Sequence, residues 1–304
     1  MFNRIKYILF IFIISCLFTN TSYQGLLIPS SLYMLLSSNE SYSLDKAIIF
    51  SNSNHPQIDD LEYNKLNNIS SSLIMFPQDI NVGSFEYSYK IADYKMQSNI
   101  QINNYGDFLD SESNYTFSSQ DFILQNRISH KINNQFYISG AIKYINSNID
   151  NYTSSALASK LNFHYHFQKP FNNGVLLHLF FNNYGIVLDT YTGYKDTLPN
   201  SYGALVMFSP VHIDALVSCQ YELFNNYHIF TLHSEIFIFQ NSSLLLSYTS
   251  LANNLYLEDF NKDFFTGISL GFSTQHQNYG LNIGIQNLGV TGIISIISIS
   301  KSLN

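Results

Sequence analysis

The sequence predicts an all-β protein: a transmembrane antiparallel β-barrel of about 14 strands with a short N-terminal helical or irregular plug. Three features of the chain lead to this prediction. Apolar and polar residues alternate along strand-length segments, such segments repeat over most of the chain, and the long connections recur at one end of the series.

The alternation is clearest in Val211–Leu223. Its odd-numbered positions are all apolar or aromatic, and its even-numbered positions are polar except for Leu216. A period of two gives a strand one apolar and one polar face. The segment is longer than the roughly 5–6 residues usual in globular sheets, and it reaches the about 9–11 residues that a tilted membrane-spanning strand needs. Lipid outside a barrel and water inside it would match the two faces.

The composition agrees with a sheet that lies between two environments. Aromatic residues make up 16% of the chain and charged residues only 12%, about half of the roughly 25% charge common in soluble proteins. The mean hydropathy is close to zero, so apolar and polar residues are balanced. The chain is neither disordered nor typical of a water-soluble domain.

Residues 1–21 are predicted to be a signal peptide. Arg4 and Lys6 precede the apolar run Ile8–Phe18, which is too short for a transmembrane helix and has the length of a signal-peptide core. The residues leading to Cys16 also resemble a lipobox, so a lipidated Cys16 stays open. In both cases we expect export, with the bacterial outer membrane as the destination.

Removal of this segment takes away two basic residues and no acid, which leaves 12 basic and 21 acidic residues and a net charge near −9. Arg127 is then the single arginine. Such an acidic chain is not expected to bind nucleic acid. Cys219 is then the single cysteine, which excludes an intrachain disulfide. Its place on the apolar face of its strand predicts a small hydrophobic residue rather than a reactive thiol.

The rest of the chain divides into two parts. Residues 22–70 show no strand pattern but short helical or irregular pieces at Leu32–Leu36 and Leu44–Phe50, which predict a plug or lid segment. Residues 71–304 predict the barrel itself. Its strands are predicted at Ser71–Gln78, Asn81–Ala92, Lys95–Tyr105, Ser118–His130, Asn134–Asn146, Tyr152–Phe167, Asn173–Gly185, Ser201–Ser209, Val211–Leu223, Tyr227–Phe239, Ser242–Ser250, Phe264–Thr274, Tyr279–Leu288 and Thr291–Lys301.

Long and short connections alternate with the strand number. Long loops are predicted at Gly106–Phe117, Ile186–Asn200 and Leu251–Asp263. They follow the third, seventh and eleventh predicted strands, so all three lie at the same end of the barrel. Turns after even-numbered strands are short. Outer-membrane barrels combine short periplasmic turns with long outer loops in this way.

Few residues suggest chemistry. His164 and His166 share the polar face of one strand with Lys160, and His178 on the next strand is the nearest further ligand for a metal. No cysteine or closely spaced acid completes a metal site, so we predict no metal and no cofactor. His212 and Asp214 have no nucleophile in a G-x-S-x-G setting, and we predict that the protein is not an enzyme.

Several short motifs point to a known family. They are Tyr105-Gly106-Asp107-Phe108, Ser154–Leu161, Asn182-Asn183-Tyr184-Gly185, Leu198-Pro199 and Ser209-Pro210-Val211-His212, with Ser53–Pro56 ahead of them. In order and spacing they resemble the PorV/PorQ group of FadL-like outer-membrane proteins associated with type IX secretion, and PorQ most closely. The chain departs from that pattern at Ser159-Lys160-Leu161, where the family often has Asp-Leu-Gly.

The motif positions are expected to be structural. Gly106 and Gly185 would end strands at loop mouths, where glycine allows positive φ. The family positions carried over to this chain are Pro56, Tyr105, Gly106, Phe108, Asn182, Gly185, Leu198, Pro199 and Pro210.

The resemblance implies a non-enzymatic barrel of type IX protein secretion that anchors or docks secretion and cargo-attachment proteins at the cell surface. Its partners would be outer-membrane lipid and surface or periplasmic secretion-system proteins. An alternative is a FadL-like channel for hydrophobic small molecules, which needs an apolar pocket. The sequence shows polar lumen faces and no obvious apolar lumen cluster, which favours the docking role. A third alternative is an exported soluble β-sandwich or adhesin that buries its apolar faces.

Overall fold

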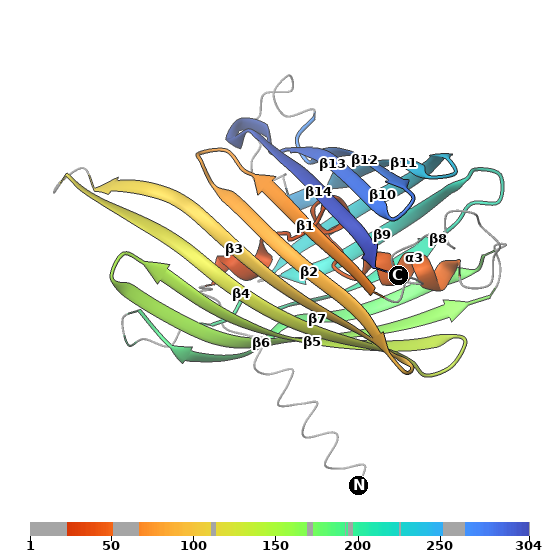
Figure 1. Ribbon diagram of the computed structural model, residues 1–304, viewed down its shortest axis with the longest axis horizontal. Coiled ribbons are helices and arrows are strands. Elements are labelled where there is room, and N and C mark those ends of the chain that lie inside the picture. Colours follow the sequence, from red (N-terminus) through yellow and green to blue (C-terminus); the bar gives the residue numbers. More distant parts are fainter. Residues whose placement is uncertain are drawn as a thin grey trace, which may run out of the picture.

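The computed structural model describes residues 23–50, 67–110, 114–168, 173–191, 193, 197–224, 226–251 and 265–303. In this part of the chain, antiparallel strands pair with their sequence neighbours, and β1 pairs with β14 to close a barrel (Figure 1). The predicted fold class, a closed antiparallel barrel of about 14 strands, is confirmed. The strands are β1 Asn67–Met75, β2 Asn81–Ile91, β3 Tyr94–Asp110, β4 Tyr115–Lys131, β5 Phe136–Ile149, β6 Tyr152–Phe167, β7 Val175–Asp189, β8 Ser201–Phe208, β9 Ala215–Phe224, β10 Tyr227–Phe239, β11 Ser242–Thr249, β12 Ile268–His276, β13 Tyr279–Asn287 and β14 Ile293–Leu303.

The barrel is apolar outside and polar inside. In β14, Ile297 and Ile299 are 42% and 58% exposed, whereas Ser298 and Ser300 are buried. The alternation predicted from the sequence therefore sorts side chains between the outer surface and the lumen. A soluble sandwich would bury the isoleucines between two sheets, so the third alternative, a β-sandwich, is wrong.

Strand β9 corrects the prediction made for Val211–Leu223. The strand begins at Ala215, because residues 211–214 form the bend that follows Pro210. Leu216, the apolar exception on the polar face, is buried in the lumen. Cys219 lies on the outer face and is exposed, as its position in the alternation predicts.

The observed strand ends differ most from the predicted ones in the hairpin of β3 and β4. The predicted loop Gly106–Phe117 is wrong, since β3 continues to Asp110 and β4 begins at Tyr115. Gly106 does not end the strand. It takes a φ of 78° within a bulge between Asn104 and Asp107, after which the pairing resumes. The hairpin consequently projects beyond its neighbours at the left of Figure 1.

Other strand ends differ from the predicted ones by a few residues. Strand β1 begins at Asn67, four residues before the predicted Ser71. Strand β7 extends to Asp189, so the connection predicted from Ile186 begins later. Residues 252–264, which hold most of the third predicted loop, lie outside the described residues.

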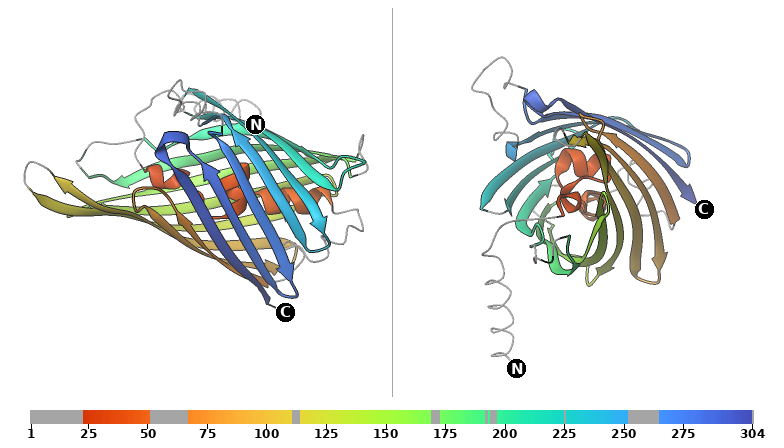
Figure 2. Two further views of the ribbon diagram at one scale, coloured as in Figure 1. Left: turned by 90° about the horizontal axis from the view of Figure 1, so that it is seen from above. Right: turned by 90° about the vertical axis from the view of Figure 1, so that its left-hand side faces the viewer.

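The N-terminal residues 23–50, called the plug from here on, lie inside the lumen. They form η2 Gln24–Leu27, α2 Leu32–Ser37 and α3 Tyr42–Ile49, which lie at the centre of the barrel when it is viewed along its axis (Figure 2, right). Ser31 begins α2 as its N-cap, because its Oγ accepts the backbone N–H of Met34 at 3.2 Å. The short helical plug predicted ahead of the barrel is thus confirmed for residues 23–50, whereas residues 67–70, predicted to belong to it, are part of β1. None of the described helices has the length and apolarity to cross a membrane.

Candidate ligand cavity in the barrel lumen

A cavity of about 490 Å³ lies between the plug and the barrel wall. This volume falls in the range of roughly 300–1,000 Å³ that small-molecule sites occupy. Most of the lining is apolar and comes from both sides: Leu26, Ile28 and Leu35 of the plug, and Phe224, Ile229 and Ile294 of the wall. Lys143, Lys160 and Glu222 make one part of the lining polar. The cavity can therefore hold an apolar molecule of small size.

The lumen is also apolar where the plug helices touch it. Helix α2 buries Leu32 and Leu36 among wall residues that include Ile74 and Ile296. Helix α3 packs against a second group of wall residues, namely Leu176, Leu205, Met207 and Leu216. The expectation that the lumen holds no apolar cluster is therefore wrong. These residues interrupt the polar faces of separate strands, and strand pairing brings them together, for example Leu176 with Met207 and, where β1 and β14 close the barrel, Ile74 with Ile296.

Glu40, between α2 and α3, faces three cations of the wall. Its carboxylate lies 2.8 Å from Arg127 Nη2, 2.9 Å from Lys143 Nζ and 3.0 Å from Lys160 Nζ. Arg127 Nη1 also donates to the Glu40 carbonyl at 2.9 Å. Burial alone would raise the pKa of the Glu40 carboxyl, but Lys143, Lys160 and Arg127 outweigh it and hold this pKa well below its ordinary value. Glu40 is thus ionised and ties the plug to β4, β5 and β6.

Helix α3 makes a second charged contact with β10. Lys46 Nζ lies 2.7 Å from Glu235 Oε1, and the Tyr42 hydroxyl donates to Glu235 Oε2 at 2.9 Å. Burial, followed by the charge on Glu235, raises the pKa of Tyr42 well above its ordinary value. The hydroxyl therefore keeps its proton and stays a donor.

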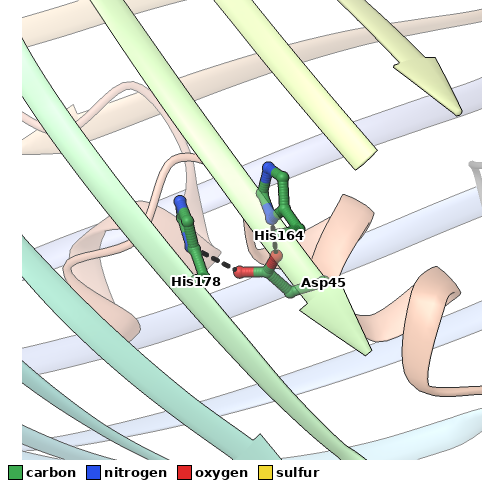
Figure 3. A group of neighbouring side chains, drawn as sticks. All are labelled: Asp45, His164 and His178. Atoms are coloured by element: carbon green, nitrogen blue, oxygen red, sulfur yellow. Dashed lines mark hydrogen bonds and ion pairs between the residues drawn. The ribbon is translucent and has the colours of Figure 1, made fainter. Parts of the chain in front are cut away.

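Asp45 of α3 meets two histidines of the wall (Figure 3). His164 on β6 and His178 on β7 face each other across the strand pair. Their Nδ1 atoms lie 2.7 Å and 3.0 Å from the two oxygens of the Asp45 carboxylate. The three side chains are 0–1% exposed.

The structure separates the three histidines that the sequence grouped. His164 and His178 come together, whereas the Nε2 atom of His166 contacts the carbonyl of Asn173 at 2.7 Å. The acid missing from the sequence pattern is Asp45, supplied by the plug. Sequence reasoning missed it because no local spacing links residue 45 to residues 164 and 178. The polar lumen face predicted for Lys160 and His164 is where the structure places them.

Four of the family-motif residues gather beside the cavity. Asn182 lines it and donates from Nδ2 to Ser201 Oγ at 3.1 Å. The Pro199 carbonyl accepts from Asn183 at 3.1 Å, and Leu198 is buried in an apolar cluster. Gly185 lies inside β7, where a Cβ would collide with the Leu157 carbonyl of β6. The positive φ predicted for Gly185 belongs to Asn183, at 58°, so close strand approach is what requires the glycine.

The other motif residues lie apart from the cavity. The Tyr105 hydroxyl donates to Asp121 Oδ2 at 2.6 Å. Phe108 is exposed near the end of the β3–β4 hairpin and stacks on Phe117, with ring centroids 5.4 Å apart. Pro210 is half-buried in the connection between β8 and β9. Pro56 and the preceding Asn-His pair lie outside the described residues.

The wall beside the cavity has a shortened strand pair. Strand β8 starts at Ser201, opposite Asn182, so its pairing with β7 stops there although β7 continues to Asp189. Pairing of β7 with β6 is also irregular opposite Ser159 and Leu161. This part of the wall is covered from inside by Tyr23, whose hydroxyl donates to the Asp189 carbonyl at 3.0 Å.

The sequence matches no protein-family model and no curated protein. The structure, however, is similar to solved barrels. They include the toluene transporter TodX of Pseudomonas putida (TM-score 0.55, 8% identity, 94% of this chain and 99% of that chain covered) and the toluene transporter TbuX of Ralstonia pickettii (0.55, 8%, 86% and 94%). The CymD monoaromatic hydrocarbon channel is a third (0.54, 9%, 92% and 97%). At this identity the likeness shows a shared fold. It shows nothing finer than the fold, and the resemblance to FadL-like proteins and to their PorV/PorQ group stays a prediction.

Proposed function

We propose that the protein is a FadL-like outer-membrane channel that passes hydrophobic small molecules through its lumen cavity. The observation that carries this proposal is the largely apolar cavity of about 490 Å³ between the plug and the barrel wall. A docking protein has no need for such a cavity, whereas a channel for apolar molecules needs one. The fold shared with toluene transporters and a hydrocarbon channel supports the same choice.

The barrel surface supports the membrane location. Exposed isoleucines such as Ile299 would contact hydrocarbon at no cost, while a charge in their place would cost roughly 2–4 kcal/mol at mid-bilayer. Export by residues 1–21 belongs to this proposal, and so does the absence of catalysis. The docking role in type IX secretion remains a prediction that rests on the PorV/PorQ resemblance.

Uptake by intact Gram-negative cells that produce the protein would test the channel. We expect faster entry of labelled toluene or of a labelled long-chain fatty acid than in cells with the empty vector. Ile229→Trp fills the cavity from the wall and should bring uptake back toward the vector level. Phe230→Trp is the matched control, because Phe230 is the next residue of β10 and is exposed on the outer face.

Two results would speak against the channel. One is equal uptake by producing cells and vector cells for every apolar probe. The other is equal loss of uptake in Ile229→Trp and Phe230→Trp cells, which would trace the effect to assembly rather than to the cavity. Co-purification of cargo-processing proteins from native membranes, without any uptake, would instead favour the docking role.

A further inference from the structure

The contacts around Asp45 form a closed ring of polar groups. Asp45 contacts both Nδ1 atoms, His178 Nε2 lies 3.3 Å from Asn162 Oδ1, and Asn162 Nδ2 donates to Ser139 Oγ at 2.8 Å. Ser139 Oγ lies 3.5 Å from His164 Nε2, which closes the ring. All five residues are buried. Every contact in this ring therefore needs its own donor, because water does not replace it.

The ring of contacts has one proton fewer than it needs. Each neutral imidazole supplies one proton, the Asn162 amide supplies one to the ring, and the Ser139 hydroxyl supplies one. These four protons cannot fill five contacts. If both Nδ1 atoms donate to Asp45, both Nε2 atoms must accept a hydrogen bond. The Ser139 hydroxyl and the Asn162 amide would then have to donate to both Nε2 atoms and also to each other, which takes three protons where they supply two. An extra proton or a bound cation would complete the set.

The orientation of Asn162 favours a cation next to Asp45. Its Oδ1 is a pure acceptor, so His178 Nε2 must carry a proton, and a neutral His178 then turns an Nδ1 lone pair toward the carboxylate. The same arrangement lets His164 donate from Nε2 to Ser139 Oγ. Each nitrogen lone pair then faces one oxygen of the same carboxylate, an arrangement that a cation between the three groups would stabilise. Histidine ligands of metals typically donate their other N–H to an oxygen, as both would here.

We propose that Asp45, His164 and His178 bind a divalent transition-metal ion of the zinc type. Two imidazole nitrogens and one carboxylate oxygen are a donor set that suits Zn²⁺. The ligand atoms lie within 4.8 Å of one another. Tetrahedral zinc with bonds of about 2.0–2.2 Å spaces its ligand atoms about 3.3 Å apart. The present N–O distances of 2.7 and 3.0 Å would lengthen by a few tenths of an ångström.

Such an ion would join the plug to the wall. Asp45 belongs to α3, whereas the histidines belong to β6 and β7. The proposal goes beyond the channel function and does not require it, because the ion would stabilise the plug in any role of the barrel.

Metal binding to the refolded, detergent-solubilised full chain tests the site. We expect the wild type to bind one Zn²⁺ per barrel in calorimetry, and Co²⁺ in its place to give visible absorption bands. Asp45→Asn, His164→Ala and His178→Ala should each weaken binding by more than about 100-fold, and Asn162→Ala by about 10–100-fold. His166→Ala is the control, since His166 is buried on the same strand outside the ring and should leave binding unchanged.

Wild-type protein that binds no stoichiometric Zn²⁺ would overturn the proposal and leave the fifth contact to a proton. Unchanged binding in His164→Ala and His178→Ala would overturn it as well. Heat-dependent gel mobility reports whether each variant is folded. If the variants do not fold, X-ray absorption of zinc on the wild type decides: a shell with two imidazoles supports the site, and a shell without imidazole refutes it. Uptake assays are independent of each of these results.

Discussion

Replacing Glu40 by glutamine should release the plug from three strands of the wall. The variant keeps the size of the side chain but leaves Arg127, Lys143 and Lys160 without the carboxylate that faces them at 2.8–3.0 Å. These cations are 6–7% exposed, so solvent does little to compensate them. Loss of one partner of a buried ion pair costs about 3–5 kcal/mol. The hydrogen bond from Arg127 to the Glu40 carbonyl survives and keeps the loss within this range.

Urea unfolding of the refolded barrel, followed by gel mobility, measures this loss. We expect the free energy of unfolding to fall by about 3–5 kcal/mol in Glu40→Gln. Glu86→Gln is the matched control, because Glu86 is a lumen acid whose described hydrogen bond comes from Ser88 Oγ at 3.3 Å. A loss under about 1 kcal/mol in Glu40→Gln, or an equal loss in Glu86→Gln, would refute the reasoning that the Glu40 carboxylate compensates the buried charges of the three cations.

Three further predictions follow from the same contacts. Lys160→Gln should leave the free energy of unfolding unchanged or raise it slightly, because it lowers the net charge of Glu40 and its three cations from +2 to +1. Lys46→Met leaves Glu235 without its cation and should lower the free energy of unfolding by about 3–5 kcal/mol in the same urea assay. The stability that Glu40 contributes should be present above its ordinary pKa of about 4.3 and be lost as the pH falls through its lower folded value. Unfolding measured against pH should therefore show a smaller acid loss in Glu40→Gln than in the wild type. In a Cys16→Ser background, Cys219 in native membranes should resist a water-soluble maleimide, because it faces outward from mid-strand; Asn226→Cys, at the β9–β10 turn, should react.

The barrel could be predicted from the sequence because each strand carries its own alternation. Ile297, Ser298 and Ile299 show locally which side faces out, whatever the neighbouring strands are. The cavity and the Asp45 site could not be predicted in this way. Asp45 contacts residues more than 100 positions away in the sequence. Leu216 is an apolar residue in an otherwise polar strand face, and the sequence does not show that the plug packs against it. Contacts between a plug and a wall depend on three-dimensional closure, for which local periodicity holds no signal.

The two halves of the plug are held by different forces, and this difference predicts where the plug opens. Residues 40–46 carry the charged contacts to the wall: Glu40, Asp45 and Lys46. Residues 23–36 line the cavity and are held by apolar packing and neutral hydrogen bonds, such as Ser84 Oγ to the Ser30 carbonyl at 2.7 Å. Neutral hydrogen bonds contribute about 0.5–1.5 kcal/mol each and charged ones about 1.5–3.

Local opening draws on the less stable segments of a fold. We therefore expect backbone amides of η2 and α2 to exchange hydrogen faster than those of α3 in the detergent-solubilised barrel, as measured by mass spectrometry. Ser38 is the natural pivot, because it ends α2 in a left-handed conformation with a φ of 55°. Faster exchange in α3 than in α2 would contradict this division of the plug. Glu40→Gln should raise exchange in α3 selectively, since that variant removes a contact of the charged half alone.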